Sequence, residues 1–166
     1  LASSIWINPV AKGVPEITKS ETMQQIRDLV KEDPQAIWLV ADMAYPSTNI
    51  PAMAGADCLN TTQTYPQKTR WEMLDPEGEY EDIYNRYCHI RAALGSKTML
   101  ELVSTDYVEV TLSPEDLKKL NIRYIVSTND FDEKIAAGTT NIFTDSGIEF
   151  QKYYEGTQLS IYGCVY

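Results

Sequence analysis

The sequence predicts an α/β protein, in which a mixed sheet with flanking helices forms a Rossmann-like layered sandwich that ends in a C-terminal β-hairpin. Two continuous apolar runs, at 36–41 and 122–127, each follow a stretch of helical pattern. Such runs are typical of strands buried on both faces, and the order helix then strand indicates a parallel layer. The third observation is a pair of β-rich runs, at 150–154 and 159–162, joined by a short turn.

Length and charge set the class of protein. The 166 residues suffice for one domain with its own core, and the net charge is -10. An acidic surface repels phosphate and anionic lipid, so nucleic acid and membrane surfaces are disfavoured as partners. No apolar run approaches the ~20 residues that cross a bilayer. We expect a linker or extended arm at 1–17 and a single α/β domain at 18–166; the start at Leu1 instead of Met predicts a processed or excised chain.

The first helix is expected between Thr18 and Pro34. Thr18 and Glu21 have the spacing of a capping box, and Pro34 disfavours helical geometry in the residue before it. One face of this helix is apolar, formed by Met23, Ile26, Leu29 and Val30. The buried strand at 36–41 follows and stops at Asp42.

The middle of the chain is harder to divide into elements. Residues 43–69 are rich in Pro, Asn, Thr and Gly, which predicts an irregular connection with a short strand at 55–59. A second helix is expected over 80–87, because four apolar or aromatic residues recur at helical spacing. These are Tyr80, Ile83, Tyr84 and Tyr87. The β-rich runs at 98–103 and 107–112 predict a strand pair.

The last third has the clearest boundaries. Ser113, followed by a proline and two acids, predicts a helix start, and Asn121 can end that helix in a left-handed conformation. The second buried strand comes next, at 122–127. A short helix is then expected over 130–137, closed by Gly138.

Asp42 is the most suggestive single residue for chemistry. It follows a buried strand directly, and ligands of open α/β sheets gather at the carboxyl ends of strands. A carboxylate there is suited to bind a hydroxyl group, a metal or a proton in transit. The alternative is that Asp42 caps the next turn through its own backbone.

His89 is the only histidine, so a Ser–His–Asp or Cys–His site would have to use it. Its neighbour Cys88 would point about 100° away on a helix, and no GxSxG elbow is present. We therefore expect His89 to be partly buried and hydrogen-bonded.

No cofactor or metal is expected. The chain lacks GxGxxG and GxxxxGK[ST] motifs, and one histidine cannot form HExxH. The acids at 75–82 are attributed to a solvated helix start, since they lack the spacing of a calcium loop. Three cysteines without a CxxC pair predict buried thiols, and one bridge with one free thiol stays open. They are Cys58, Cys88 and Cys164.

One segment has chemistry that suits carbohydrate hydroxyls. Residues 65–71 combine aromatic faces with planar donors, although packing in the core is the alternative for these rings.

Four segments carry a resemblance to a known family. The run from Leu117 to Ser127 resembles a helix-to-strand segment in the extracytoplasmic domains of large bacterial multi-pass membrane proteins. These are glycosyltransferases of the GT-C type and their relatives, including proteins implicated in glycosylating lipoteichoic acid. The tail from 150 to 162 is similar to their terminal hairpin. The segments 38–42 and 85–90 also look like a related group of membrane proteins.

The resemblance implies a non-catalytic domain on the extracytoplasmic face of the bacterial cell membrane. The catalytic acid of that family lies in a loop between transmembrane helices, so no catalytic residue is assigned in this chain. The implied partners are the protein's own transmembrane segment and a glycan or cell-wall polymer acceptor. The residues expected to contact the glycan are Asp42, Arg70, Trp71, Asn85 and Arg86.

Two alternatives remain open from the sequence. One is a small stand-alone enzyme with its site at the end of the 36–41 strand, which would place Asp42 and His89 in a concave pocket, within hydrogen-bond reach or bridged by one water. The other is a protein-interaction module, which would expose a contiguous apolar patch.

Overall fold

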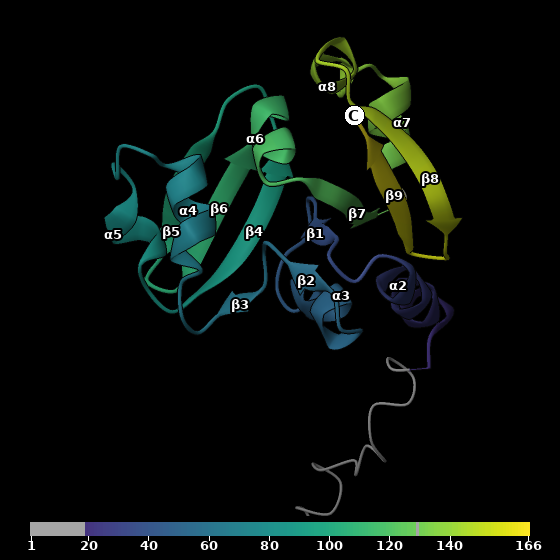
Figure 1. Ribbon diagram of the computed structural model, residues 1–166, viewed down its shortest axis with the longest axis horizontal. Coiled ribbons are helices and arrows are strands. Elements are labelled where there is room, and N and C mark those ends of the chain that lie inside the picture. The colour runs from purple at the N-terminus through teal and green to yellow at the C-terminus, as the bar shows by residue number, and fades with distance from the viewer. Residues whose placement is uncertain (1–18, 129) are drawn as a thin grey trace, which may run out of the picture.

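The computed structural model describes residues 19–128 and 130–166 and contains two mixed sheets with helices packed around them (Figure 1). This confirms the predicted α/β class. The first sheet contains, in order across it, β2 (Asp57–Cys58), β1 (Ile37–Val40), β7 (Ile122–Thr128), β9 (Leu159–Val165) and β8 (Glu149–Glu155). The second contains β3 (Thr62–Gln63), β4 (Cys88–Leu94), β6 (Tyr107–Leu112) and β5 (Met99–Ser104).

Strand β1 is the centre of a parallel layer, as its apolar sequence predicts. It pairs in parallel with β2 on one side and with β7 on the other. Leu39 packs into one core with β4 and β6, whereas Trp38 and Val40 pack into the second core against helix α2 (Glu21–Glu32). The strand is therefore buried on both faces.

The ends of several elements follow from local sequence. Helix α2 is capped by Ser20, whose hydroxyl accepts a hydrogen bond from the Met23 amide; the predicted cap, Thr18, and the predicted arm at 1–17 lie outside the described residues. Helix α6 (Pro114–Lys119) has a complete capping box between Ser113 and Asp116. Asn121 has a φ of 51°, which is the predicted left-handed helix end.

The remaining helices are short. They are η1 (Ser47–Asn49), α3 (Ile50–Met53), α4 (Lys68–Leu74), α5 (Glu81–Tyr84), α7 (Asp130–Ala136) and α8 (Asn141–Asp145). The predicted irregular region at 43–69 thus holds η1, α3, β2 and β3, and β2 is the short strand expected at 55–59. Hairpins β5–β6 and β8–β9 are also confirmed.

The helix predicted over 80–87 is wrong in its second half. Helix α5 ends at Tyr84, Tyr87 is exposed, and Cys88 begins β4. Tertiary pairing with β6 overrides the local tyrosine spacing, because Cys88, Ile90 and Ala92 alternate with outward residues along a strand. Cys88 and the next residue, His89, consequently face opposite sides of a sheet.

Asn60 joins the two sheets. It follows β2, precedes β3 and is fully buried. Its side chain accepts a hydrogen bond from the Val40 amide at 2.9 Å and donates one to the Val40 carbonyl at 2.7 Å. One residue further along β1, Ala41 forms a parallel bridge with Ala92 of β4. The Asn60 side chain thus pairs with the backbone of β1 in place of a neighbouring strand, next to the residue at which the chain contacts the four-stranded sheet.

No helix in the described part of the chain is long and apolar enough to cross a membrane.

Candidate functional site

The structure places Asp42 at the carboxyl end of β1, as predicted, with a left-handed φ of 61°. Its amide donates to the Ala92 carbonyl at 2.8 Å, which continues the contact between β1 and β4. Its carboxylate is 2.5 Å from the Lys134 ammonium of α7. The carboxylate is therefore already held by a cation.

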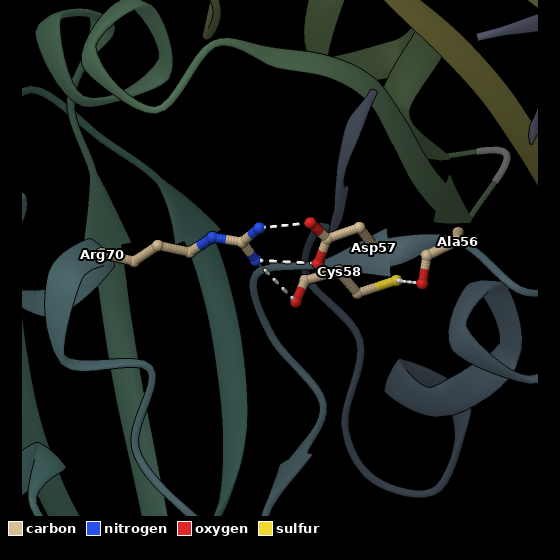
Figure 2. A network of polar contacts seen from close by, with 4 residues as sticks. All are labelled: Ala56, Asp57, Cys58 and Arg70. Atoms are coloured by element: carbon tan, nitrogen blue, oxygen red, sulfur yellow. Dashed lines mark hydrogen bonds and ion pairs between the residues drawn. The ribbon is translucent and has the colours of Figure 1, made fainter. Parts of the chain in front are cut away.

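Arg70 lies on α4 and reaches β2 at the edge of the five-stranded sheet (Figure 2). Its guanidinium forms two hydrogen bonds with the Asp57 carboxylate of β2 and a longer one, at 3.5 Å, with the Cys58 carbonyl. The arrangement resembles a fork of two parallel bonds, which fixes the orientation of Arg70. We assign Arg70 a tethering role between α4 and β2.

Trp71 is part of the core and only 1% exposed. Its indole N–H donates to the Gln63 side-chain oxygen at 2.7 Å, and its ring stacks on Tyr84 with centroids 5.4 Å apart. In this structure the ring offers no exposed face to a sugar, which agrees with core packing, the alternative weighed for the rings of 65–71.

The two remaining residues predicted for ligand contact follow α5. Asn85 is exposed and is the C-cap of the helix. Arg86 is half-buried, and its guanidinium donates to the Asp82 carbonyl one helical turn before it. Within the described ranges, no direct hydrogen bond or ion pair joins any two of the five predicted contact residues, although Gln63 bonds both the Trp71 indole and the Arg86 carbonyl.

Two tyrosine rings and a threonine hydroxyl surround His89, which is half-buried. We define the His89 cluster as Tyr45, Thr62, Tyr87 and His89. The His89 ring lies 4.2 Å from the Tyr45 ring and 5.5 Å from the Tyr87 ring, between centroids. Both tyrosines are about half exposed, at 50% and 51%. The cluster therefore presents aromatic faces and an imidazole to solvent.

Hydroxyl groups approach both nitrogens of His89. The Thr62 Oγ1 is 3.0 Å from Nδ1, and the Tyr87 hydroxyl is 3.5 Å from Nε2. Asn49 fixes Thr62, because its amide donates to Oγ1 at 3.1 Å and accepts from the Thr62 backbone at 2.9 Å. Both imidazole nitrogens therefore have a hydroxyl partner, and which group donates in each contact depends on the tautomer of His89.

The backbone explains why these side chains meet. Thr62 and His89 are direct partners in the β3–β4 pairing, so their side chains share one face of the sheet. Their neighbours Gln63 and Cys88 are also partners and are buried on the opposite face. The expectation that His89 is partly buried and hydrogen-bonded is confirmed.

A small polar pocket of about 100 Å³ shares Thr62 with the cluster. Its walls are rich in hydroxyl and amide side chains, and they include Tyr65, which is 84% exposed. The lining residues are Leu59, Thr61, Thr62, Gln63, Thr64, Tyr65, Gln67 and Ile90. Part of the segment predicted to suit sugar hydroxyls therefore lies beside the cluster.

Asp42 and His89 have different partners, and no direct hydrogen bond or ion pair joins them in the described part of the chain. Asp42 is bound to Lys134 and His89 to Thr62 and Tyr87. The larger grooves, of about 490 and 550 Å³, lie at the start of α2 and beside α6, and histidine lines neither.

The cysteines are free, buried thiols, as expected. Burial raises the pKa of Cys58 and Cys164 to about 12 and that of Cys88 to about 11, all from an ordinary value of 9.0. These thiols stay protonated near neutral pH and are poor nucleophiles. In 19–128 and 130–166, no group of three or more His, Cys, Asp or Glu side chains is placed to hold a metal ion.

The sequence offered one signal for the His89 cluster. Outward His89 alternates with inward Cys88 and Ile90, which is the period of a half-buried strand. The contributions of Tyr45 and Thr62 depend on pairing between distant segments and have no local signal.

Comparisons with known proteins add a family. A family model described as "Domain of unknown function (DUF7654)" matches residues 16–166. No curated protein and no solved structure matches the chain. The family match spans both sheets, the His89 cluster and all five residues predicted for ligand contact. Because it covers most of the sequence, the chain belongs to the DUF7654 family.

Proposed function

We propose that this chain is a non-catalytic extracytoplasmic domain of a membrane glycosyltransferase-like protein, which holds a glycan or cell-wall polymer acceptor near the membrane catalyst. The observation that carries the glycan-binding part is the His89 cluster. The membrane-protein part derives from the sequence resemblance of 117–127 and 150–162. These two segments contain the end of α6, most of β7 and most of the β8–β9 hairpin.

The chemistry of the cluster suits a sugar. The Tyr45 and Tyr87 rings are exposed enough to pack against the C–H face of a pyranose. Thr62 and His89 sit beside them with hydroxyl and imidazole groups that hydrogen-bond to sugar hydroxyls. A half-buried imidazole between two exposed rings is typical of a binding surface, where apolar area and a few oriented polar groups act together.

A binding role also agrees with the chemistry of the candidate catalytic groups. The Asp42 carboxylate is held by Lys134, and the buried thiols remain protonated. A general base needs a free acceptor within reach of the proton that it abstracts.

The test of glycan binding is an array of defined uncharged and anionic oligosaccharides probed with the full chain. We expect wild-type binding, and a loss of about tenfold or more in affinity for Tyr45→Ala or Tyr87→Ala. Tyr153→Ala is the matched control, because Tyr153 is 49% exposed but lies on β8 of the other sheet. No binding to the array, or equal losses in all three variants, would contradict the proposal.

The membrane part has its own test. The reading frame upstream of residue 1 should encode a series of hydrophobic helices, each of ~20 residues. A frame without them would remove the membrane parent and the extracytoplasmic location, and would leave glycan binding to be judged by the array.

A protein-interaction module is the second candidate, and edge strand β5 favours it. Met99, Leu102 and Val103 are exposed on this strand, and among the described strands only β6 pairs with it. If β5 docks on the protein's own membrane segment, Val103→Lys should abolish co-purification with that segment and leave glycan binding unchanged. Co-purification that survives Val103→Lys would exclude β5 as the contact.

A further inference from the structure

We infer that the ligand of the His89 cluster is an uncharged oligosaccharide that lies across the strands of the four-stranded sheet, from β3 over β4 to β6. This inference rests on the proposed glycan binding, and it names the class of ligand and the path that the oligosaccharide takes across the sheet. The path is the row Thr62–His89–Tyr107 on the outer face of the sheet, with the Tyr45 and Tyr87 rings beside it.

The row follows from the strand register. Thr62 pairs with His89 across β3 and β4, and His89 pairs with Tyr107 across β4 and β6. Side chains of directly paired residues lie on the same face of a sheet. All three are half-buried. Tyr107 therefore extends the His89 cluster by one strand.

Among the described residues, the outer face of this sheet belongs to neither apolar core. The inner face packs into a core through Ile90, Val108 and Val110, whereas the aromatic contacts of the outer face are the Tyr45 and Tyr87 rings on His89. The outer residues beyond the row are exposed or half-buried, and all but Met99 are polar or small. They are Arg91, Ala93, Met99, Glu101, Glu109 and Thr111.

The charges of this face argue against an anionic polymer. In the next row, Arg91 is 2.8 Å from Glu109, and Glu109 pairs with Glu101 across β5 and β6. One cation thus faces two carboxylates, so the row is net negative. The whole chain carries a net charge of -10, which repels polyanions over a longer range. A sugar polymer without phosphate or carboxylate groups meets no such penalty.

The length of the row sets the size of the ligand. Neighbouring strands lie about 4.8 Å apart, so two steps from β3 to β6 span roughly 10 Å. This is the length of a disaccharide, and the flanking rings add room for a further unit. We therefore expect affinity to rise from monosaccharide to trisaccharide and then to level off.

The experiment measures affinity for linear uncharged gluco-, galacto- and manno-oligosaccharides of one to six units and for poly(glycerol phosphate). We expect at least one uncharged series to bind, with affinity rising to the trisaccharide, and no binding of poly(glycerol phosphate). Tyr107→Ala should weaken trisaccharide binding about tenfold and leave the monosaccharide within about twofold. Tyr107→Phe keeps the ring and serves where the alanine variant fails to fold; it should show a smaller loss with the same dependence on length.

The outcomes separate this inference from the proposed function. If uncharged sugars bind and Tyr87→Ala weakens them, but length and Tyr107 have no effect, glycan binding stands and the path across β6 is wrong. If poly(glycerol phosphate) binds as tightly as the sugars, the uncharged class is wrong. If none of these oligosaccharides binds, the inference fails. If no glycan on the array described above binds either, the proposed function is contradicted as well.

Discussion

At the residue scale, two buried tryptophans differ in one hydrogen bond. The Trp71 indole N–H donates to Gln63, whereas the Trp38 indole N–H has no partner within the described part of the chain. Both rings are almost fully buried, so replacement by phenylalanine removes a similar volume from each site. Only Trp71→Phe leaves a buried acceptor unpaired, namely the Gln63 side-chain oxygen. The Gln63 amide N–H groups remain bonded to the backbone carbonyls of Tyr84 and Arg86.

We therefore expect Trp71→Phe to lower the free energy of unfolding by about 1–2 kcal/mol more than Trp38→Phe does. Urea denaturation of both variants measures the difference. Equal losses would mean that the Gln63 bond contributes nothing net. Gln63→Leu is the control on the partner, because it leaves the Trp71 indole N–H and the Tyr84 and Arg86 carbonyls without this side chain and should cost more than Trp71→Phe.

The three buried thiols make stability depend on pH in the alkaline range. Their pKa values are raised to about 11 and 12 in the folded protein, from the ordinary 9.0. Above pH 9 the unfolded chain releases these protons and the folded chain keeps them, so the free energy of unfolding falls as pH rises. The stabilisation is fully present below pH 9 and is lost as pH rises through 11 to 12.

We expect the free energy of unfolding to be about 1 kcal/mol lower per thiol at pH 10 than at pH 9. Urea denaturation at pH 7, pH 9 and pH 10 gives the profile. Cys58→Ala should make the decline shallower, while a substitution away from the thiols, such as Met53→Ala, should leave its slope unchanged. A flat profile from pH 9 to pH 10 would contradict the burial of the thiols.

At the element scale, the junction at Asn60 is the contact most sensitive to a small change. Asn60→Asp replaces the donor to the Val40 carbonyl with a carboxylate oxygen, so two acceptors face each other in a fully buried site. We expect a loss of about 2–4 kcal/mol in the free energy of unfolding.

Asn49→Asp is the matched control. Asn49 also makes one donor and one acceptor contact, both with Thr62, but it is half-buried. Its replacement should cost less than half as much, because water reaches the new carboxylate. Chemical denaturation of both variants makes the comparison, and equal losses would show that burial is not what makes the Asn60 contact important.

The elements that the sequence predicts well are those with local signals. The apolar runs predict β1 and β7, the Ser113 cap predicts α6, and a turn between β-rich runs predicts the β8–β9 hairpin. Strand β4 has an alternating pattern, but the tyrosine spacing just before it suggested a longer helix. Strand β3 has two residues and is defined by its pairing with β4, a contact between segments distant in the sequence.

The site was predicted less well for the same reason. The expectation that Asp42 ends a buried strand is confirmed, because it depends only on the run before it. The structure places Trp71 in the core and ties Arg70 to Asp57, and neither contact has a sequence signal. The His89 cluster assembles residues from the loop after β1, from β3 and from β4, so pairing between distant segments creates it.

At the scale of the whole molecule, the two sheets share one core and should unfold together. Leu39 and Ile125 of the first sheet pack in the same cluster as Ile90 and Val108 of the second. Because either sheet would lose this apolar contact if the other unfolded alone, we expect a single cooperative transition.

Tryptophan fluorescence can follow each sheet separately. In a Trp6→Phe background, Trp71→Phe leaves Trp38 to report on the first sheet, and Trp38→Phe leaves Trp71 to report on the second. Within each variant, the fluorescence and far-UV circular dichroism transitions should coincide. Transitions with separate midpoints would mean that the sheets unfold as independent units.

The side-chain bond between Asn60 and Val40 also has a consequence for hydrogen exchange. A strand amide is normally protected by a neighbouring backbone carbonyl, but the Val40 amide is protected by a side-chain oxygen. Exchange at this position requires Asn60 to withdraw from between the sheets. Because the two sheets share one core, we expect this withdrawal to require global unfolding, so the protection factor of the Val40 amide should match the free energy of global unfolding.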